Sequence, residues 1–130
     1  EAWVTKNPYA RAGLYGQCTW FAWGRFYELY GYDPGFSGDG SSCVKELIAA
    51  HPDKFERSSS PKAGAVFSAI GHNHVGIVIA VKDNTITVQE GNLDGITNTF
   101  QDAKKDWQTK SYTLDQLRSI YGGVVFANPK

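Results

Sequence analysis

The stretch HVGIVIAVKDNTITVQEGN, residues 74–92, decides the fold of this chain. Two apolar runs, 75–81 and 85–90, flank the polar segment Lys82-Asp83-Asn84, a pattern typical of a β-hairpin. We expect a three-residue loop, with Asn84 in the left-handed conformation that such loops require. This loop length sets which residues of the two strands face each other.

The predicted register brings a histidine, a carboxylate and an amide together at the open end of the hairpin. Four cross-strand pairs share one face of the sheet: Ala80–Ile86, Val78–Val88, Gly76–Glu90 and His74–Asn92. A carboxylate on an otherwise apolar face needs a partner, and an imidazole is the obvious one. Glu90 would then fix the tautomer of His74 and stabilise its imidazolium. A loop of two or four residues would instead turn His74 to the opposite face.

The segment before the hairpin is predicted to be mainly helical. Bulky residues on two faces indicate a buried helix from Cys18 to about Tyr30, stopped by Gly31. A second helix, capped by Ser41 or Ser42 and ended by Pro52, carries an apolar stripe of Val44, Leu47 and Ile48. The segment 57–62 is polar and is expected to be a linker.

Strands dominate the rest of the chain. They are expected at 65–70, 74–81, 85–90 and 123–127, with a further one between 96 and 100. Thr113 is expected to cap a short helix to Tyr121, with Leu114, Leu117 and Ile120 pointing inward. Helices followed by an antiparallel meander define an α+β fold, with the first helix carrying Cys18.

Cys18 is the candidate nucleophile because it begins the first predicted helix. A thiol there faces unpaired N–H groups and the positive end of the helix dipole, which favours the thiolate. The same N–H groups can hold a developing oxyanion. Cys43 lies among apolar neighbours and is expected to be a buried structural thiol. A disulfide between the two cysteines is the alternative.

Composition narrows the class of protein. The 130 residues suffice for one domain, and 13 Lys plus Arg balance 13 Asp plus Glu. A neutral chain argues against generic binding to nucleic acid or anionic lipid. No apolar run is long enough to span a bilayer and no signal peptide is recognisable. Because the chain has no Met, we expect an excised domain or a processed form of a larger modular protein.

Four motifs in this order resemble those of CHAP domains, the cysteine- and histidine-dependent amidohydrolases/peptidases. They are Tyr15-Gly16-Gln17-Cys18-Thr19-Trp20-Phe21-Ala22, Pro61-Lys62-Ala63-Gly64-Ala65-Val66, His74-Val75-Gly76-Ile77-Val78 and Val88-Gln89-Glu90-Gly91-Asn92. The resemblance runs from about Asn7 to Ala127. It implies a papain-like fold in which Cys18 is the nucleophile, His74 the base and Glu90 the group that orients it, with Asn92 nearby.

The chain departs from the family pattern in three places. Ala65 stands where the family often has Asp, and position 12 is Ala where papain-type enzymes carry an oxyanion glutamine. The segment 7–17 has no Asp or Glu, so the calcium loop of some phage members is not expected. The pair His72-Asn73-His74 lacks enough further ligands for zinc, and no metal or cofactor is predicted.

Substrate contacts are predicted from residues around the two central motifs. Gln17 adjoins the nucleophile, His72 is expected on the rim of the groove, and Tyr15 and Trp107 fall in predicted loops. Asp33, Asp39 and Asp94 sit in Gly-rich loops, where an ordinary turn role is expected.

The resemblance implies a peptidoglycan hydrolase that cuts an amide bond, as an N-acetylmuramoyl-L-alanine amidase or as a stem or cross-bridge endopeptidase. The resemblance also implies a monomer. It would be secreted, bound to the cell wall, or delivered to the wall by a phage. Two alternatives stay open: a catalytically silent wall-binding or scaffold module, and an amidase acting on a small thiol conjugate such as glutathionylspermidine.

Overall fold

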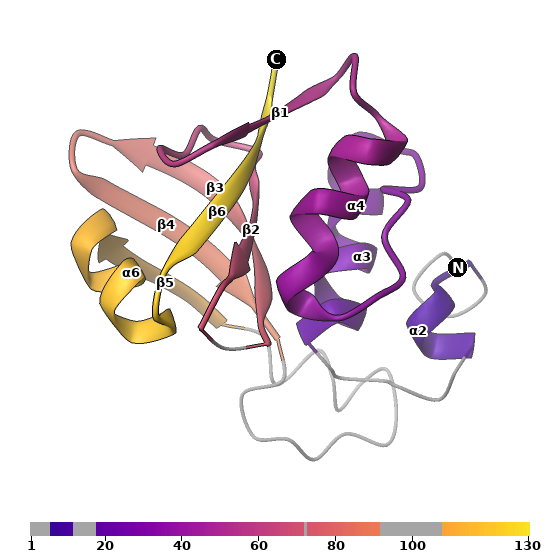
Figure 1. The fold of residues 1–130 in the computed structure, drawn as a ribbon, viewed down its shortest axis with the longest axis horizontal. Coiled ribbons are helices and arrows are strands. Elements are labelled where there is room, and N and C mark those ends of the chain that lie inside the picture. The colour runs from indigo at the N-terminus through magenta and orange to yellow at the C-terminus, as the bar shows by residue number, and fades with distance from the viewer. Residues whose placement is uncertain (1–5, 12–17, 72, 92–107) are drawn as a thin grey trace.

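The computed structural model describes residues 6–11, 18–71, 73–91 and 108–130. Its elements form one six-stranded antiparallel sheet with helices on both faces (Figure 1). The helices α2 (Pro8–Arg11), α3 (Cys18–Tyr30) and α4 (Cys43–Ala50) lie on one side, and α6 (Leu114–Tyr121) lies on the other. The expectation of an α+β fold with antiparallel strands is confirmed.

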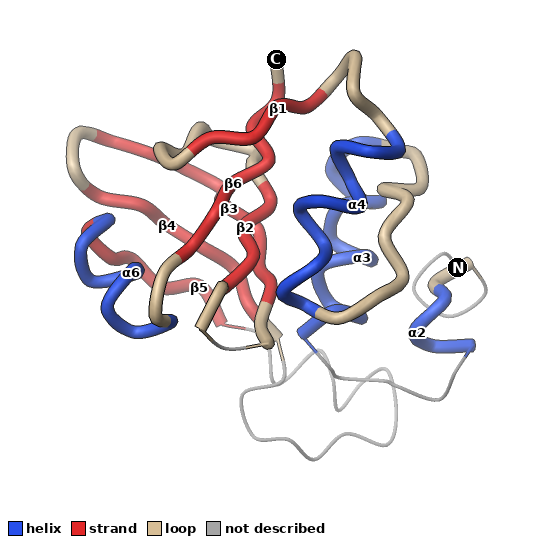
Figure 2. Tube along the Cα trace, in the orientation of Figure 1, coloured by secondary structure: helices blue, strands red, loops and turns tan. Residues whose placement is uncertain are grey.

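The strands are β1 (Phe55–Ser58), β2 (Val66–Ala69), β3 (Val75–Lys82), β4 (Thr85–Glu90), β5 (Gln108–Thr113) and β6 (Val124–Pro129). Their order across the sheet is β1-β6-β2-β3-β4-β5 (Figure 2). The four strands β2 to β5 form a meander, and β6 returns to pair with β2. The sheet therefore places the start of β3 and the end of β4 side by side.

Two strands were not predicted. The strand β1 includes part of the segment expected to be a linker, and only Phe55 among its residues is buried. The strand β5 is polar along its length and has no fully buried residue. Both are edge strands, whose exposed faces carry no apolar alternation to reveal them. The strand expected between 96 and 100 lies outside the described residues.

The hairpin loop is shorter than predicted. Lys82 pairs with Thr85, so the loop has two residues, and Asp83 rather than Asn84 adopts the left-handed conformation, with φ 54°. A register shift between Val78 and Ala80 inserts one extra residue into β3. Beyond the bulge the register is the predicted one, and Val78 faces Val88 as expected. Between the loop and the bulge the predicted pair Ala80–Ile86 is wrong, because the shorter loop pairs Ile86 with Val81.

The helix α3 begins at Cys18 and ends at Tyr30, where Gly31 follows with φ 80°. Its first turns are buried on all sides, which agrees with apolar bulk on two faces. A 3-10 turn, η1 (Gly40–Ser42), precedes α4, and the side chain of Ser42 makes no capping bond. None of the helices within the described residues is long and apolar enough to cross a bilayer.

Thr113 caps the helix α6 as predicted, and its side chain accepts from the Gln116 backbone N–H at 3.1 Å; the Gln116 side chain completes a capping box that was not predicted. Leu117 is buried, but the expectation that Ile120 points inward is wrong, because Ile120 is 48% exposed. A helix repeats every 3.6 residues, so the inward positions after Leu114 and Leu117 fall at Tyr121. This shift of one residue brings the Tyr121 hydroxyl towards the end of β4.

Candidate active site

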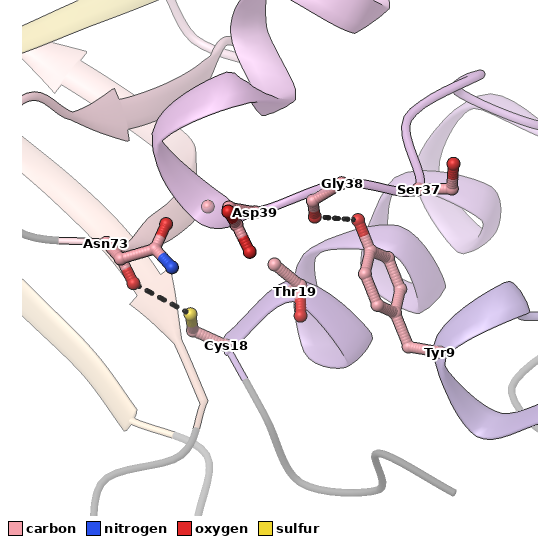
Figure 3. Close-up of a pocket in the computed structure, with 8 residues that line it drawn as sticks. Tyr9, Cys18, Thr19, Ser37, Gly38, Asp39 and Asn73 are labelled. Carbon is pink, nitrogen blue, oxygen red and sulfur yellow. Dashed lines mark hydrogen bonds between the residues drawn. The ribbon is translucent and has the colours of Figure 1, made fainter. Parts of the chain in front are cut away.

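Cys18 lies where α3 meets the start of β3. Its Sγ is 3.9 Å from the carbonyl oxygen of Asn73, the residue before His74 (Figure 3). The Cys18 residue is 7% exposed, and it is one of the residues that line a pocket. Cys18 is the first residue of α3, as the sequence predicts, and a helix carries unpaired N–H groups and the positive end of its dipole at that end.

His74 and Glu90 form a buried pair across β3 and β4. The imidazole Nε2 is 2.8 Å from Glu90 Oε1, and the Glu90 residue is only 1% exposed. Burial by itself raises the pKa of Glu90, but the hydrogen bonds from His74 and Tyr121 outweigh it and lower that pKa below its ordinary value. The carboxylate is therefore charged at neutral pH.

The imidazole is held ready to carry a proton. Burial lowers the pKa of His74, but its hydrogen bonds with Cys18 and Glu90 raise that pKa to about 9. Glu90 contacts Nε2, which leaves Nδ1 as the other nitrogen of the ring. Helix α3, the β3–β4 register and the bulge together bring Cys18, His74 and Glu90 into one site.

Tyr121 is a fourth member of this site that sequence reasoning missed. Its hydroxyl donates to Glu90 Oε1, the same oxygen that His74 contacts. Its ring stacks on the imidazole, with centroids 4.8 Å apart and an interplanar angle of 18°. The helical period of α6 makes Tyr121 the next inward position after Leu117, but it does not show that the hydroxyl meets Glu90.

A pocket of about 220 Å³ opens beside the thiol (Figure 3). Its lining residues are Tyr9, Cys18, Thr19, Ser37, Gly38, Asp39, Gly40 and Asn73. Tyr9 donates its hydroxyl to the Gly38 carbonyl at 2.7 Å, which ties α2 to the loop before η1. Apart from Cys18, none of these residues was predicted to contact substrate.

Cys43 is a free, fully buried thiol, as expected, and the alternative of a disulfide with Cys18 is wrong. Its Sγ donates to the Asp39 carbonyl at 3.4 Å and lies 3.8 Å from the Tyr9 hydroxyl. Burial is the main cause that raises the pKa of Cys43 far above its ordinary value. A neutral buried thiol is a poor nucleophile, which leaves Cys18 as the reactive candidate.

Five predicted site residues lie outside the described residues: Tyr15, Gln17, His72, Asn92 and Trp107. Their assignments stay predictions. Within the described ranges there is no group of three or more His, Cys, Asp and Glu side chains that could hold a metal ion. The prediction that the pair His72 and His74 binds no zinc stays a prediction, because His72 lies outside the described residues.

This combination of sheet, helices and buried His–Glu pair defines the class of papain-like α+β folds with a cysteine at the start of a helix. The family model of the CHAP domain matches residues 5–92, more than half of the chain. The chain belongs to the CHAP domain family. Tyr121 lies beyond the matched segment.

Solved structures share this fold. An N-acetylmuramoyl-L-alanine amidase from Staphylococcus aureus is 20% identical, with a TM-score of 0.56 over 88% of this chain and 30% of that one. Ly7917 is 18% identical, with a TM-score of 0.57 over 88% of this chain and 53% of that one. Ly7917 with the hydrolyzing product of MDP gives a TM-score of 0.54 at 18% identity, over 88% and 54%. No curated protein matches the chain in sequence.

Proposed function

We propose that this chain is a peptidoglycan hydrolase that cleaves an amide bond, with Cys18 as nucleophile, His74 as proton carrier and Glu90 as its orienting group. The observation that carries the proposal is the buried His74–Glu90 pair beside a cysteine at a helix start. Membership of the CHAP family supports it, and so does the fold shared with an amidase.

The reaction begins from a thiolate and an imidazolium. Sγ of Cys18 attacks the amide carbonyl carbon, and the carbonyl electrons move to oxygen, where N–H groups at the start of α3 stabilise the charge. The tetrahedral intermediate collapses as Nδ1 of His74 gives its proton to the departing nitrogen. The C–N bond breaks and a thioester remains on Cys18.

Water completes the cycle. Neutral His74 takes a proton from water through Nδ1, and the hydroxide attacks the thioester carbonyl. The C–S bond breaks, the acid product leaves and the thiolate returns. Through both steps Glu90 holds Nε2–H and favours the charged imidazole, so the tautomer needed at Nδ1 is kept.

The substrate is proposed from the relatives. One protein with this fold is an N-acetylmuramoyl-L-alanine amidase, and this favours an amidase over an endopeptidase for the present chain. The chain spans about half or less of the solved proteins it resembles. We propose that it is one catalytic domain of a larger modular protein and that it acts outside the cell, in or on the wall.

Digestion of purified Gram-positive sacculi tests the proposal. The domain is compared with Cys18→Ala and with the matched variant Cys43→Ala, and released fragments are identified by mass spectrometry. Fragments from the unmodified domain and Cys43→Ala, but not from Cys18→Ala, are expected, and their new termini identify the bond. Binding without release by all three would favour the silent module. Release by Cys18→Ala would remove Cys18 as nucleophile.

A further inference from the structure

One wall of the pocket beside Cys18 carries the carboxylate of Asp39, and the proposed catalytic steps do not use this group. Asp39 is exposed, and its side chain points towards Thr19 and Cys18 (Figure 3). It is the N-cap residue of η1, where an aspartate normally accepts a backbone N–H, yet its side chain makes no capping bond. The expected turn role holds for Asp33, which accepts from the Gly35 N–H at 2.7 Å, but not for Asp39.

Hydrogen bonds fix the backbone of Asp39, whereas its carboxylate has no side-chain partner among the described residues. Its carbonyl accepts from the Ser42 N–H at 2.9 Å and from the Cys43 thiol at 3.4 Å. Across the described residues, no side chain forms an ion pair or hydrogen bond with the Asp39 carboxylate. A fixed backbone with a free charge facing a pocket is the arrangement expected of a ligand-binding group.

The surroundings strengthen the negative charge. Among the described residues that line the pocket, none is a lysine, arginine or histidine. A second carboxylate, Glu46, accepts from the Gly38 N–H at 3.0 Å directly behind the loop. A group drawn to this wall must be positively charged or rich in N–H donors.

The loop that carries Asp39 contacts the chain at Asn73 and His74, directly before β3. Asn73 Oδ1 accepts from the Ser41 backbone N–H at 3.0 Å and from the Ser41 hydroxyl at 3.2 Å. Gly40 packs so closely that a Cβ there would lie 2.7 Å from the carbonyl carbon of His74. Asp39 therefore stands at a set position relative to Cys18 and His74, as a specificity residue must.

We propose that Asp39 binds a primary ammonium group on the peptide portion of the substrate, next to the amide bond that Cys18 attacks. This inference rests on the proposed function. The peptides of bacterial walls carry positive charge as primary amines, on the side chain of a diamino acid or at the free end of a cross-bridge. Either source presents the same alkylammonium to the carboxylate.

Blocking the amine tests this directly. Sacculi are used untreated or after acetylation with acetic anhydride, which neutralises amines and leaves amide bonds intact. The unmodified domain, Asp39→Asn and the control Asp53→Asn, which changes an exposed aspartate away from the pocket, are compared by kcat/KM. Acetylation is expected to slow the unmodified domain and Asp53→Asn about tenfold, the size of one partly desolvated charged hydrogen bond. Asp39→Asn should be about tenfold slower on untreated sacculi and insensitive to acetylation.

An Asp39→Asn variant that keeps the full response to acetylation overturns the proposal, as does an unmodified domain that ignores acetylation. If the unmodified domain cleaves neither substrate, the proposed function fails and binding decides this inference separately. The probe is then Nα-acetyl-L-lysine amide, titrated while the backbone amide signals of Gly38 and Gly40 are followed by NMR. Shifts that vanish with the Nε-acetylated probe and in Asp39→Asn support the site, and their absence from the unmodified domain refutes it.

Discussion

Replacing Glu90 by glutamine should lower the pKa of His74 while keeping the packing of the site. Glutamine has the same shape, and its carbonyl can still accept from His74 and Tyr121. Only the charge is lost. Because the carboxylate favours the protonated imidazole, its neutralisation must lower the pKa of His74.

The expected change in the pKa of His74 can be worked out from the contacts that raise it. The pKa of His74 is raised from 6.5 to about 9 although burial alone would lower it. At about 1.4 kcal/mol per pKa unit, Cys18 and Glu90 together favour the imidazolium by at least ~3 kcal/mol. With Glu90 neutralised, we expect the pKa of His74 to fall by about one to two units, so that the imidazolium is lost about one to two pH units lower.

Two measurements check this prediction. NMR titration of the imidazole reports the pKa of His74, and the pH dependence of iodoacetamide alkylation reports the reactivity of Cys18, since Cys43 is fully buried. Glu56→Gln, at an exposed site on β1, is the matched control and should leave both profiles unchanged. A His74 pKa that is the same in Glu90→Gln and the unmodified domain would refute the role assigned to Glu90.

Three further outcomes are expected. The folded-state pKa of His74 lies above its ordinary value, so its contribution to the free energy of unfolding is complete below pH 6.5 and lost as the pH rises to about 9; urea unfolding across this range should show the decline, and a flat profile would contradict it. Tyr121→Phe keeps the ring stack but removes the donor to Glu90, so it should raise the pKa of Glu90 and cost about 2 kcal/mol of stability in denaturant unfolding, whereas an unchanged midpoint would show that the hydroxyl is dispensable. Gly40→Ala should lower kcat because its Cβ would press on the backbone of His74, measured on sacculi alongside thermal unfolding, and full activity would mean that the loop yields.

Some features followed from residues close together in the sequence. The start of α3 at Cys18, its end before Gly31 and the cap of α6 at Thr113 were all predicted, because each depends on neighbours within one helical turn. The meeting of His74 and Glu90 was also predicted, but through a loop one residue too long. The bulge in β3 compensated for that error.

The bulge itself was not predictable from the hairpin, since period-two alternation carries no mark of an inserted residue. The same limit applies to Tyr121, whose hydroxyl reaches Glu90 only because α6 packs on the far side of the sheet. It applies again to Asp39, which joins the pocket through contacts between loops far apart in the chain.

The sequence by itself thus determined the α+β class, the helix that presents Cys18 and the strand pair that joins His74 to Glu90. These depend on local periodicity and on short connections, where few alternative arrangements exist. Tertiary structure alone decided which side chains complete the site around them. Tyr121 and Asp39 reach it through packing between segments distant in sequence, and such contacts depend on how every intervening element is placed.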